Sequence, residues 1–290
     1  MLDPRLILSV LSLGGAIGTS RFLRGRRQAY AHRVEKIRQA LLTDPEPDPF
    51  AIAWVAGLPE AARRYLVHAI APGVQIPTSA HLRMLGNIRA QPGGEWLEVE
   101  AEEVLAPPLG LVWSARIRGR VLSLQGDEFY LHGEGERCFW FADRLPLLRT
   151  RGPDFSRSTA GRVAAESILL PTSLLPGHAL EWRPGDDMDS ARVIFSVDGT
   201  PAELTIRIAS DGALRSASLQ RWGPTRFGPV DKRAGGGRYG WQRFRVDSFA
   251  ERTFAGITIP ARLSATWIPD PEEGPEFEFF RVEITRATFG

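Results

Sequence analysis

Residues 191–221 read ARVIFSVDGTPAELTIRIASDGALRSASLQR. Apolar residues occupy alternate positions in this stretch, and the runs are separated by Asp198-Gly199 and Asp211-Gly212. Strict alternation is typical of strands with one buried and one wet face, and Asp-Gly between two such runs favours a tight hairpin. We therefore predict a three-stranded antiparallel meander over residues 191–221.

The two-residue period continues on both sides of this meander. It runs from residue 79 to residue 131 and returns over residues 241–288, which gives ~10 strands by pattern. In one run Trp113, Ala115 and Ile117 alternate with polar neighbours. The sequence therefore predicts that Trp113 lies on a buried face.

Two segments have helical patterns instead. Residues 58–70 begin with Leu58-Pro59, and proline suits the first helical position. Residues 153–175 interrupt the strands with a mostly apolar helix. Because no strand-helix-strand alternation is present, a doubly wound parallel sheet is excluded. We predict a mainly β, β-rich α+β fold, in which a large curved antiparallel sheet, or half-barrel, wraps around a central helix, with N-terminal helices.

The N-terminus differs in character from the rest of the chain. Residues 6–20, LILSVLSLGGAIGTS, carry no charge, and arginines follow at positions 21, 24, 26 and 27. A short membrane anchor, a cleaved signal peptide and a helix docked on the protein's own core all fit this pattern. We expect membrane association through an N-terminal anchor, because the basic flank fits the positive-inside rule. That flank favours a cytoplasmic main domain, although the side of the membrane and cleavage stay open.

Charge is distributed unevenly along the chain. The first 38 residues carry a formal charge of +6 and the whole chain +2, so the remainder carries −4. A mildly acidic body does not attract phosphate backbones, which excludes nucleic acid as a partner. We divide the chain into an anchor-like or signal-like segment over residues 1–27, an amphipathic helix with a proline-rich linker over 28–50, and one antiparallel β-rich domain over 51–290.

Motifs for common catalytic and metal chemistry are missing from the sequence. Cys138 is the single cysteine, so neither an internal disulfide nor a multi-cysteine zinc site can form. The five histidines show no paired ligand spacing, and the glycine-rich run over 235–240 lacks the residues of a phosphate-binding loop. We predict no metal and no cofactor.

Two features stand out as a candidate ligand site. Glu166 follows Arg162 by one helical turn on a face that also carries leucines, so the carboxylate is expected in apolar surroundings. It is interpreted as a structural Arg–Glu pair, a polar anchor for a ligand, or a general acid. Tryptophans within the strand-forming regions favour aromatic walls around an apolar ligand. The candidate ligand-binding residues are Arg162, Glu166, Trp113, Trp140, Trp182 and Trp267.

Three motifs carry a resemblance to a known family. They are Leu58-Pro59 with Arg64-Tyr65-Leu66, the run Leu111 to Arg116, and Arg162-x-x-x-Glu166-x-x-x-x-Pro171-Thr172-x-Leu174-Leu175. Over residues 55–288 the chain resembles a bacterial family known only as a domain of unknown function, which implies no established activity. Its layout is also similar to the half-barrel of periplasmic lipoprotein carriers, which implies a curved sheet holding acyl chains beneath helices.

We expect a membrane-proximal, non-catalytic binding module for a hydrophobic or lipid-like small molecule. One alternative is a hydrolase or isomerase that uses Glu166 as general acid or base, which requires a second polar group near that carboxylate. Another is an interaction or scaffold protein without a ligand, in which the barrel is filled and an apolar patch is exposed. Whether the hollow of the sheet is packed or empty separates these readings.

Overall fold

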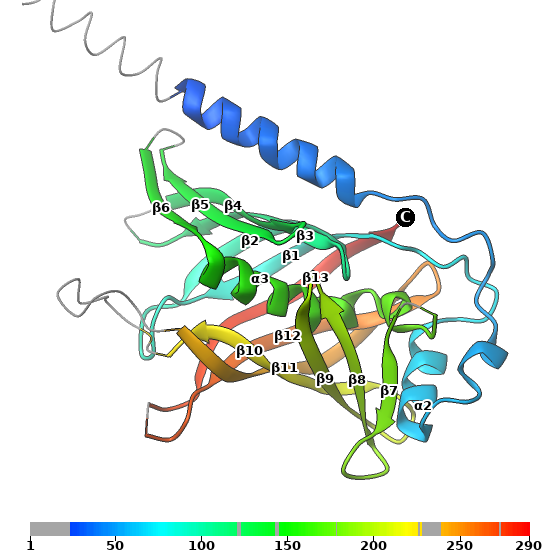
Figure 1. The fold of residues 1–290 in the computed structure, drawn as a ribbon. Coiled ribbons are helices and arrows are strands. Elements are labelled where there is room, and N and C mark those ends of the chain that lie inside the picture. The colour runs from blue at the N-terminus through cyan, green and yellow to red at the C-terminus, as the bar shows by residue number, and fades with distance from the viewer. Residues whose placement is uncertain are drawn as a thin grey trace, which may run out of the picture.

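The protein is described by a computed structural model over residues 24–120, 123–142, 145–177, 179–225, 227, 239–272 and 274–290. Across these ranges, thirteen strands form one antiparallel sheet that does not close into a barrel (Figure 1). In chain order they are β1 Ala80–Ile88, β2 Leu97–Ala106, β3 Gly110–Arg118, β4 Ser123–Leu131, β5 Glu134–Phe141, β6 Leu145–Arg151, β7 Glu181–Pro184, β8 Ser190–Val197, β9 Thr200–Ile208, β10 Leu214–Pro224, β11 Tyr239–Phe254, β12 Ile257–Ile268 and β13 Phe277–Phe289.

The sheet consists of two meanders joined along one pair of strands. Its order is β6-β5-β4-β3-β2-β1-β13-β12-β11-β10-β9-β8-β7, so β1 pairs with β13, and β6 and β7 are the edges. The predicted class, a large curved antiparallel sheet around a central helix, is confirmed. The helices are one over residues 24–41, η1 Ile52–Val55, α2 Glu60–Ala69, α3 Pro153–Glu166, η2 Ser167–Leu169 and η3 Pro171–Leu174.

The meander over residues 191–221 is confirmed as β8, β9 and β10. Asp198 and Gly199 link the first two strands with φ angles of 46° and 77°. Positive φ at both positions is what a two-residue turn needs to match the twist of the strands. The local sequence therefore sets this register without help from the rest of the fold.

The central helix is shorter than the apolar pattern suggests. α3 begins at Pro153 and ends at Glu166, and Leu169 and Leu170 lie in the turns that follow. Pro171 explains this difference, because the residue before a proline avoids the helical conformation. Leu170 accordingly has φ −136° and ψ 73°.

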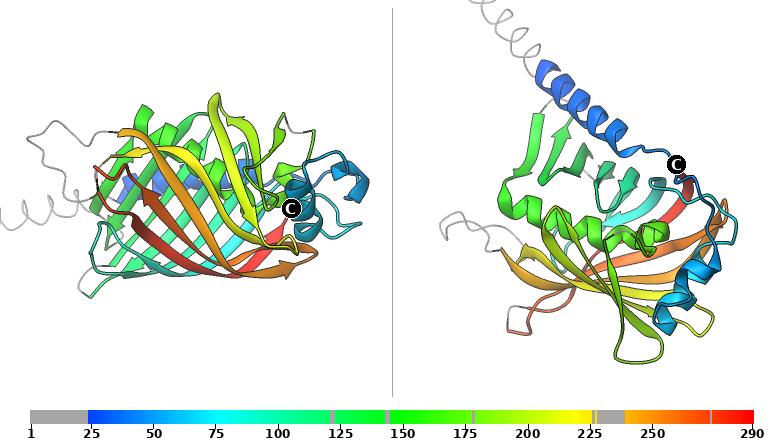
Figure 2. Two further views of the ribbon diagram at one scale, coloured as in Figure 1. Left: turned by 90° about the horizontal axis from the view of Figure 1, so that it is seen from below. Right: turned by 45° about the vertical axis from the view of Figure 1, so that its right-hand side comes forward.

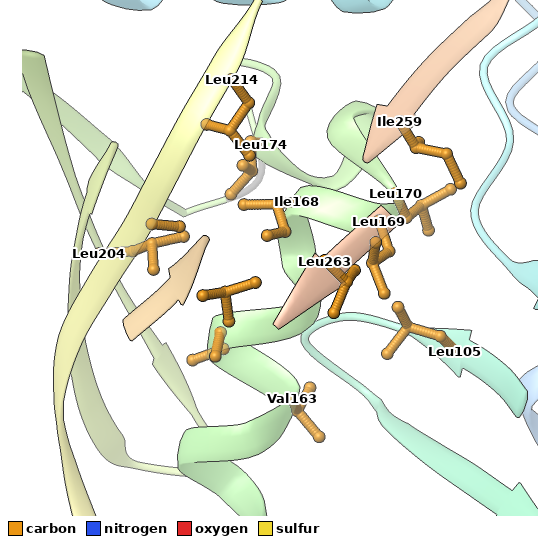
Figure 3. Packing of buried hydrophobic residues seen from close by; sticks show 14 of the residues in the cluster. Leu105, Val163, Ile168, Leu169, Leu170, Leu174, Leu204, Leu214, Ile259 and Leu263 are labelled. Atoms are coloured by element: carbon orange, nitrogen blue, oxygen red, sulfur yellow. The ribbon is translucent and has the colours of Figure 1, made fainter. Parts of the chain in front are cut away.

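α3 lies on the concave side of the sheet, and its apolar residues join the main core there (Figure 2). Figure 3 shows Ile168, Leu169 and Leu170 in the packing that follows the helix. They meet side chains from several strands, among them Leu105 on β2, Leu204 on β9, Leu214 on β10, and Ile259 and Leu263 on β12. This packing fixes α3 inside the half-barrel.

The helix over residues 24–41 covers the opposite, convex face of β2 to β5 (Figures 1 and 2). Tyr30 and Val34 pack there against Phe129 and Trp140 in a second core. The tyrosine and tryptophan ring centroids lie 6.1 Å apart. The sequence predicted a wet outer face for these strands, and this was wrong where the helix lies, because helix and sheet bury one another's apolar residues.

The structure has more strands than the pattern predicted, and β5 and β6 account for much of the difference. Both lack clean alternation. β5 carries Gly135 and Arg137 among its inward-facing positions, and β6 is an edge strand that contains Pro146. An edge strand pairs on one side only and needs no regular apolar face.

The predicted anchor falls on residues 1–23, outside the described residues. None of the helices in the described part of the chain combines the length and apolar character needed to cross a bilayer. The three-part division of the chain stays a prediction.

Trp113 provides a direct test of the strand register. Its side chain is 4% exposed, as the alternation predicted, so Trp113→Ala is expected to lower the free energy of unfolding by ~3–5 kcal/mol. Trp241→Ala is the matched control, because that side chain is 46% exposed and its loss is expected to cost less than ~1 kcal/mol. Urea denaturation followed by circular dichroism measures both, and equal losses would contradict the assigned faces.

Candidate functional site

A cavity of about 430 Å³ lies between α3 and the concave face of the sheet. Its volume falls within the range of ~300–1,000 Å³ that is common for small-molecule sites. The wall is mostly apolar and aromatic, with side chains from both meanders: Met84, Ile88, Leu97, Trp113, Ile117, Leu124, Phe139, Leu148, Phe155, Ile168, Leu169, Phe227, Phe244, Val246, Leu263, Ala265, Trp267, Phe277, Phe279, Phe280, Val282 and Ile284.

Arg162 is the centre of a buried ionic network on one wall of this cavity. Its Nε donates to Glu166 at 2.7 Å, its Nη2 to Glu103 at 2.9 Å and its Nη1 to Glu128 at 3.1 Å. The guanidinium carbon lies 5.2 Å from the ring centre of Trp113. One arginine on the central helix thus binds carboxyl groups from its own helix, from β2 and from β4.

The alternation of side chains along β2 and β4 places two of these carboxyl groups on the inward face of the sheet. Glu103 shares the inward face of β2 with Val99, Ala101 and Leu105, and its side chain is fully buried. Glu128 lies at the corresponding inward position of β4 and is buried as well. Because a buried charge needs a partner, both positions depend on Arg162.

Glu103 and Glu166 are close enough to share a proton. Burial raises the pKa of Glu103 well above its usual value, and the neighbouring Glu166 charge raises it further. Each of these two carboxyl groups has one buried oxygen, Oε2, that lacks a hydrogen-bond partner when both are ionised. A proton on Glu103 would let this carboxyl group donate a hydrogen bond to Glu166, which is one cause of its raised pKa.

The pKa of Glu128 is shifted in the opposite direction. Burial opposes its ionisation, but the guanidinium groups of Arg162 and Arg137 outweigh burial and lower its pKa. Burial likewise opposes the charge of Arg162, yet its three glutamate partners raise the pKa of the guanidinium. The network therefore shifts the pKa values of its two strand carboxyl groups in opposite directions.

Arg221 is a further buried cation in the cavity wall. Arg221 lies on β10, and its Nε donates to the carbonyl oxygen of Ser158 on α3 at 3.0 Å. The residue is only 7% exposed. The guanidinium carbon lies 4.7 Å from the ring centre of Phe244 and 4.8 Å from that of Trp267. Burial lowers the pKa of Arg221 to about 10.

The structure brings four of the six predicted site residues together. Arg162, Glu166, Trp113 and Trp267 all line the cavity. Trp140 instead faces the helix over residues 24–41 on the convex side. Trp182 donates its indole N–H to the carbonyl oxygen of Leu174 at 2.9 Å and lies outside the lining. Both were expected at the site because they lie in β runs, but tryptophan content alone does not say which face a strand position occupies.

Sequence reasoning missed five charged residues of the lining: Arg89, Glu103, Glu128, Arg137 and Arg221. A usable signal was present for the four that lie within strands, because they alternate in step with buried apolar positions. Arg221, for example, follows Ala217 and Leu219 at the two-residue period. A charge in phase with the core side of a strand is the pattern to look for.

In the described segments, no group of three or more His, Cys, Asp or Glu side chains is arranged to hold a metal ion. Cys138 is buried beneath the helix over residues 24–41, and burial raises the pKa of its thiol. A thiol of that kind is a weak nucleophile. The chemistry of the cavity therefore rests on its carboxyl and guanidinium groups.

Comparison with known proteins bears out the family resemblance. The model of a family of unknown function, DUF6544, matches residues 49–281. None of the curated proteins matches the chain.

Solved structures with a similar layout are distant. A LolA superfamily protein from Nitrosomonas europaea is 9% identical, with a TM-score of 0.43 over 81% of this chain and 94% of that one. A DUF1329 family protein from Desulfovibrio piger is 14% identical, with a TM-score of 0.35 over 85% of this chain and 94% of that one. Likenesses of this order assign no activity.

The ionic network predicts strongly coupled mutations. Arg162→Met removes the cation that Glu103, Glu128 and Glu166 share, and leaves Glu128 with Arg137 at 3.7 Å. This loss is expected to cost ~3–5 kcal/mol of unfolding free energy. Adding Glu166→Gln is expected to recover only part of this loss, because Glu103 and Glu128 still face the methionine. Adding Glu128→Gln as well is expected to recover more. Urea denaturation of the single, double and triple variants measures the coupling, and an Arg162→Met protein as stable as the parent would contradict a buried network.

The raised pKa of Glu103 predicts a pH dependence. The folded state keeps a proton that an unfolded glutamate loses near pH ~4.3, so the folded state binds more protons above that pH. The stability of the parent relative to Glu103→Gln is therefore expected to fall as pH rises, by up to ~1.4 kcal/mol per pH unit below the folded pKa.

Denaturation of parent and variant from about pH 5 to about pH 8 measures this slope. Glu98→Gln is the control, because Glu98 is exposed on the same strand. Parallel stability curves for parent and Glu103→Gln would show that Glu103 is ionised in the folded protein.

Proposed function

The chain belongs to the family of unknown function DUF6544, and we propose that it is a binding module that encloses a hydrophobic or lipid-like small molecule. The observation that carries this proposal is the cavity of about 430 Å³ between α3 and the sheet. Side chains from both meanders line it, and most of them are aliphatic or aromatic. Such a wall favours a ligand that loses contact with water when it binds.

Whether the concave side of the sheet is filled or empty distinguishes a scaffold protein from a ligand-binding module. A scaffold protein without a ligand is expected to fill the concave side with its own core, as far as packing allows. Here Leu170 and Leu174 are buried in the core away from the cavity, while a cavity is left between Trp113, Trp267 and α3. This difference supports a ligand-binding role over a purely structural one.

The rival role of Glu166 as general acid or base has one supporting observation, the neighbouring Glu103. Both carboxyl groups, however, each use one oxygen to bind Arg162. Their remaining Oε2 atoms are both buried, and a proton on Glu103 would join them by a hydrogen bond. This arrangement favours a network that holds α3 on the sheet, and the enzymatic alternative stays a prediction.

We also propose that the module works near a membrane. The uncharged stretch over residues 6–20 and the arginines after it support this part of the proposal. The helix over residues 24–41 comes soon after that stretch in the sequence and is packed on the sheet. An anchor at the N-terminus would thus hold the cavity close to the lipid surface.

Binding of the uncharged fluorescent probe N-phenyl-1-naphthylamine tests the ligand proposal. The parent is expected to bind the probe with an increase in its fluorescence, and native mass spectrometry of protein from cells is expected to show a copurified lipid. Ala265→Phe places a ring in the cavity and is expected to weaken probe binding by about tenfold or more.

Ala250→Phe is the matched control, because Ala250 is exposed on β11 and the same ring there leaves the cavity unchanged. Circular dichroism establishes that both variants are folded. A parent that neither binds the probe nor carries a copurified lipid would remove the basis of the proposal.

A further inference from the structure

We propose that Arg221 binds the head group of an anionic amphiphile, a carboxylate or a phosphate, while the apolar chain of this ligand fills the rest of the cavity. This inference rests on the proposed function, since it names the class of ligand that the same cavity takes.

Arg221 differs from Arg162 in its partners. Arg162 binds three carboxyl groups, whereas no acidic side chain of the described residues forms an ion pair with Arg221. A buried guanidinium without an anionic partner is costly for the folded protein. A ligand anion at this position would supply the missing partner, and the planar guanidinium suits a carboxylate or phosphate.

The charges around the cavity favour an anionic ligand. Arg89, Arg137, Arg162 and Arg221 bring four guanidinium groups to the wall, which also carries three glutamates. Burial raises the pKa of one of them, Glu103, and so disfavours its negative charge. Burial lowers the pKa of Arg221, Glu128 and Glu166 oppose this shift, and the guanidinium groups of Arg162 and Arg137 add to it. An anion beside Arg221 would further stabilise its charge.

The local packing is built around the Arg221 side chain. A Cβ atom at Gly161 of α3 would lie 2.8 Å from the Cγ atom of Arg221, so glycine leaves room for the arginine stem beneath the helix. Gly223, two residues further along β10, leaves room for the Trp267 ring in the same way. Glycines at both positions let the guanidinium lie over the Phe244 and Trp267 rings.

The apolar wall continues from this point. Trp267 contacts Phe244 at a ring-centroid distance of 5.0 Å, and Phe227 lies 5.9 Å from Trp267 and 4.8 Å from Phe277. A chain attached to a head group at Arg221 would therefore lie directly against aromatic rings. Within one cavity, the polar head group would contact the Arg221 guanidinium and the apolar chain would contact aromatic rings.

Competition against bound N-phenyl-1-naphthylamine tests the assignment. The competitors are palmitate, hexadecyl phosphate, the neutral alcohol hexadecanol, and inorganic phosphate without a chain. The parent is expected to bind at least one of the two anionic amphiphiles about tenfold or more tightly than hexadecanol, and not to bind inorganic phosphate. Which of the two anions binds more tightly identifies the head group.

Arg221→Met keeps the stem that packs against Gly161 and removes the charge. It is expected to lose the preference for the anion, while its affinity for hexadecanol and for the fluorescent probe changes by less than about twofold. Arg215→Met is the control, because Arg215 is exposed on the same strand. Since Arg221 has no carboxylate partner among the described residues, we expect Arg221→Met to unfold in urea no earlier than the parent.

The two proposals fail in different ways. A parent that does not bind the fluorescent probe contradicts the cavity as a ligand site altogether. A parent that binds the probe but takes hexadecanol as tightly as both anions contradicts only the role of Arg221. An anion preference that survives in Arg221→Met, or competition by inorganic phosphate alone, also contradicts it.

Discussion

Arg162 joins the central helix to the concave face of the sheet through three carboxyl groups. Removing a charge from water carries a large cost, which good geometry and further hydrogen bonds must offset. The three donors of the guanidinium used here reach β2, β4 and α3 itself, at distances between 2.7 and 3.1 Å. The position of α3 in the half-barrel is consequently set by direction-specific contacts as well as by apolar packing.

This constraint also explains why a cavity exists beside the helix. The turns after Glu166 pack Ile168, Leu169 and Leu170 deep into the core, which holds that end of the helix close to the sheet (Figure 3). At the level of Arg162 the ionic network bridges helix and strands, and the cavity lies beside it with rings such as Trp113 in its wall. A sheet that stays open and a helix that is held at a fixed distance together leave room for a ligand.

An open sheet has two edges, and each is protected in a different way. β7 is only four residues long and ends at Pro184. β6 contains Pro146, Arg149 and Arg151, and Arg149 donates to Glu136 of the neighbouring strand at 2.8 Å. Short length, proline and charge all disfavour pairing with another sheet.

The elements whose geometry depends on near neighbours could be predicted from the residue pattern alone. The meander over residues 191–221 needed only alternation and Asp-Gly turns, and the burial of Trp113 followed from its strand phase. The pairing of Arg162 with Glu166 followed from helical spacing. Each of these features follows from the spacing of residues that are near one another in the sequence, and such spacing is visible as a pattern.

Packing between segments distant in the sequence determines which faces of the strands are covered and which charged side chains form ion pairs. The helix over residues 24–41 turned the outer face of β2 to β5 into a second core, and it placed Trp140 there. Glu103 and Glu128 came to Arg162 from strands far away in the sequence. Arg221 likewise came to lie under α3. Pairing across the sheet and packing of the helices bring these residues together, and no local pattern records which distant strand supplies the partner of a buried charge.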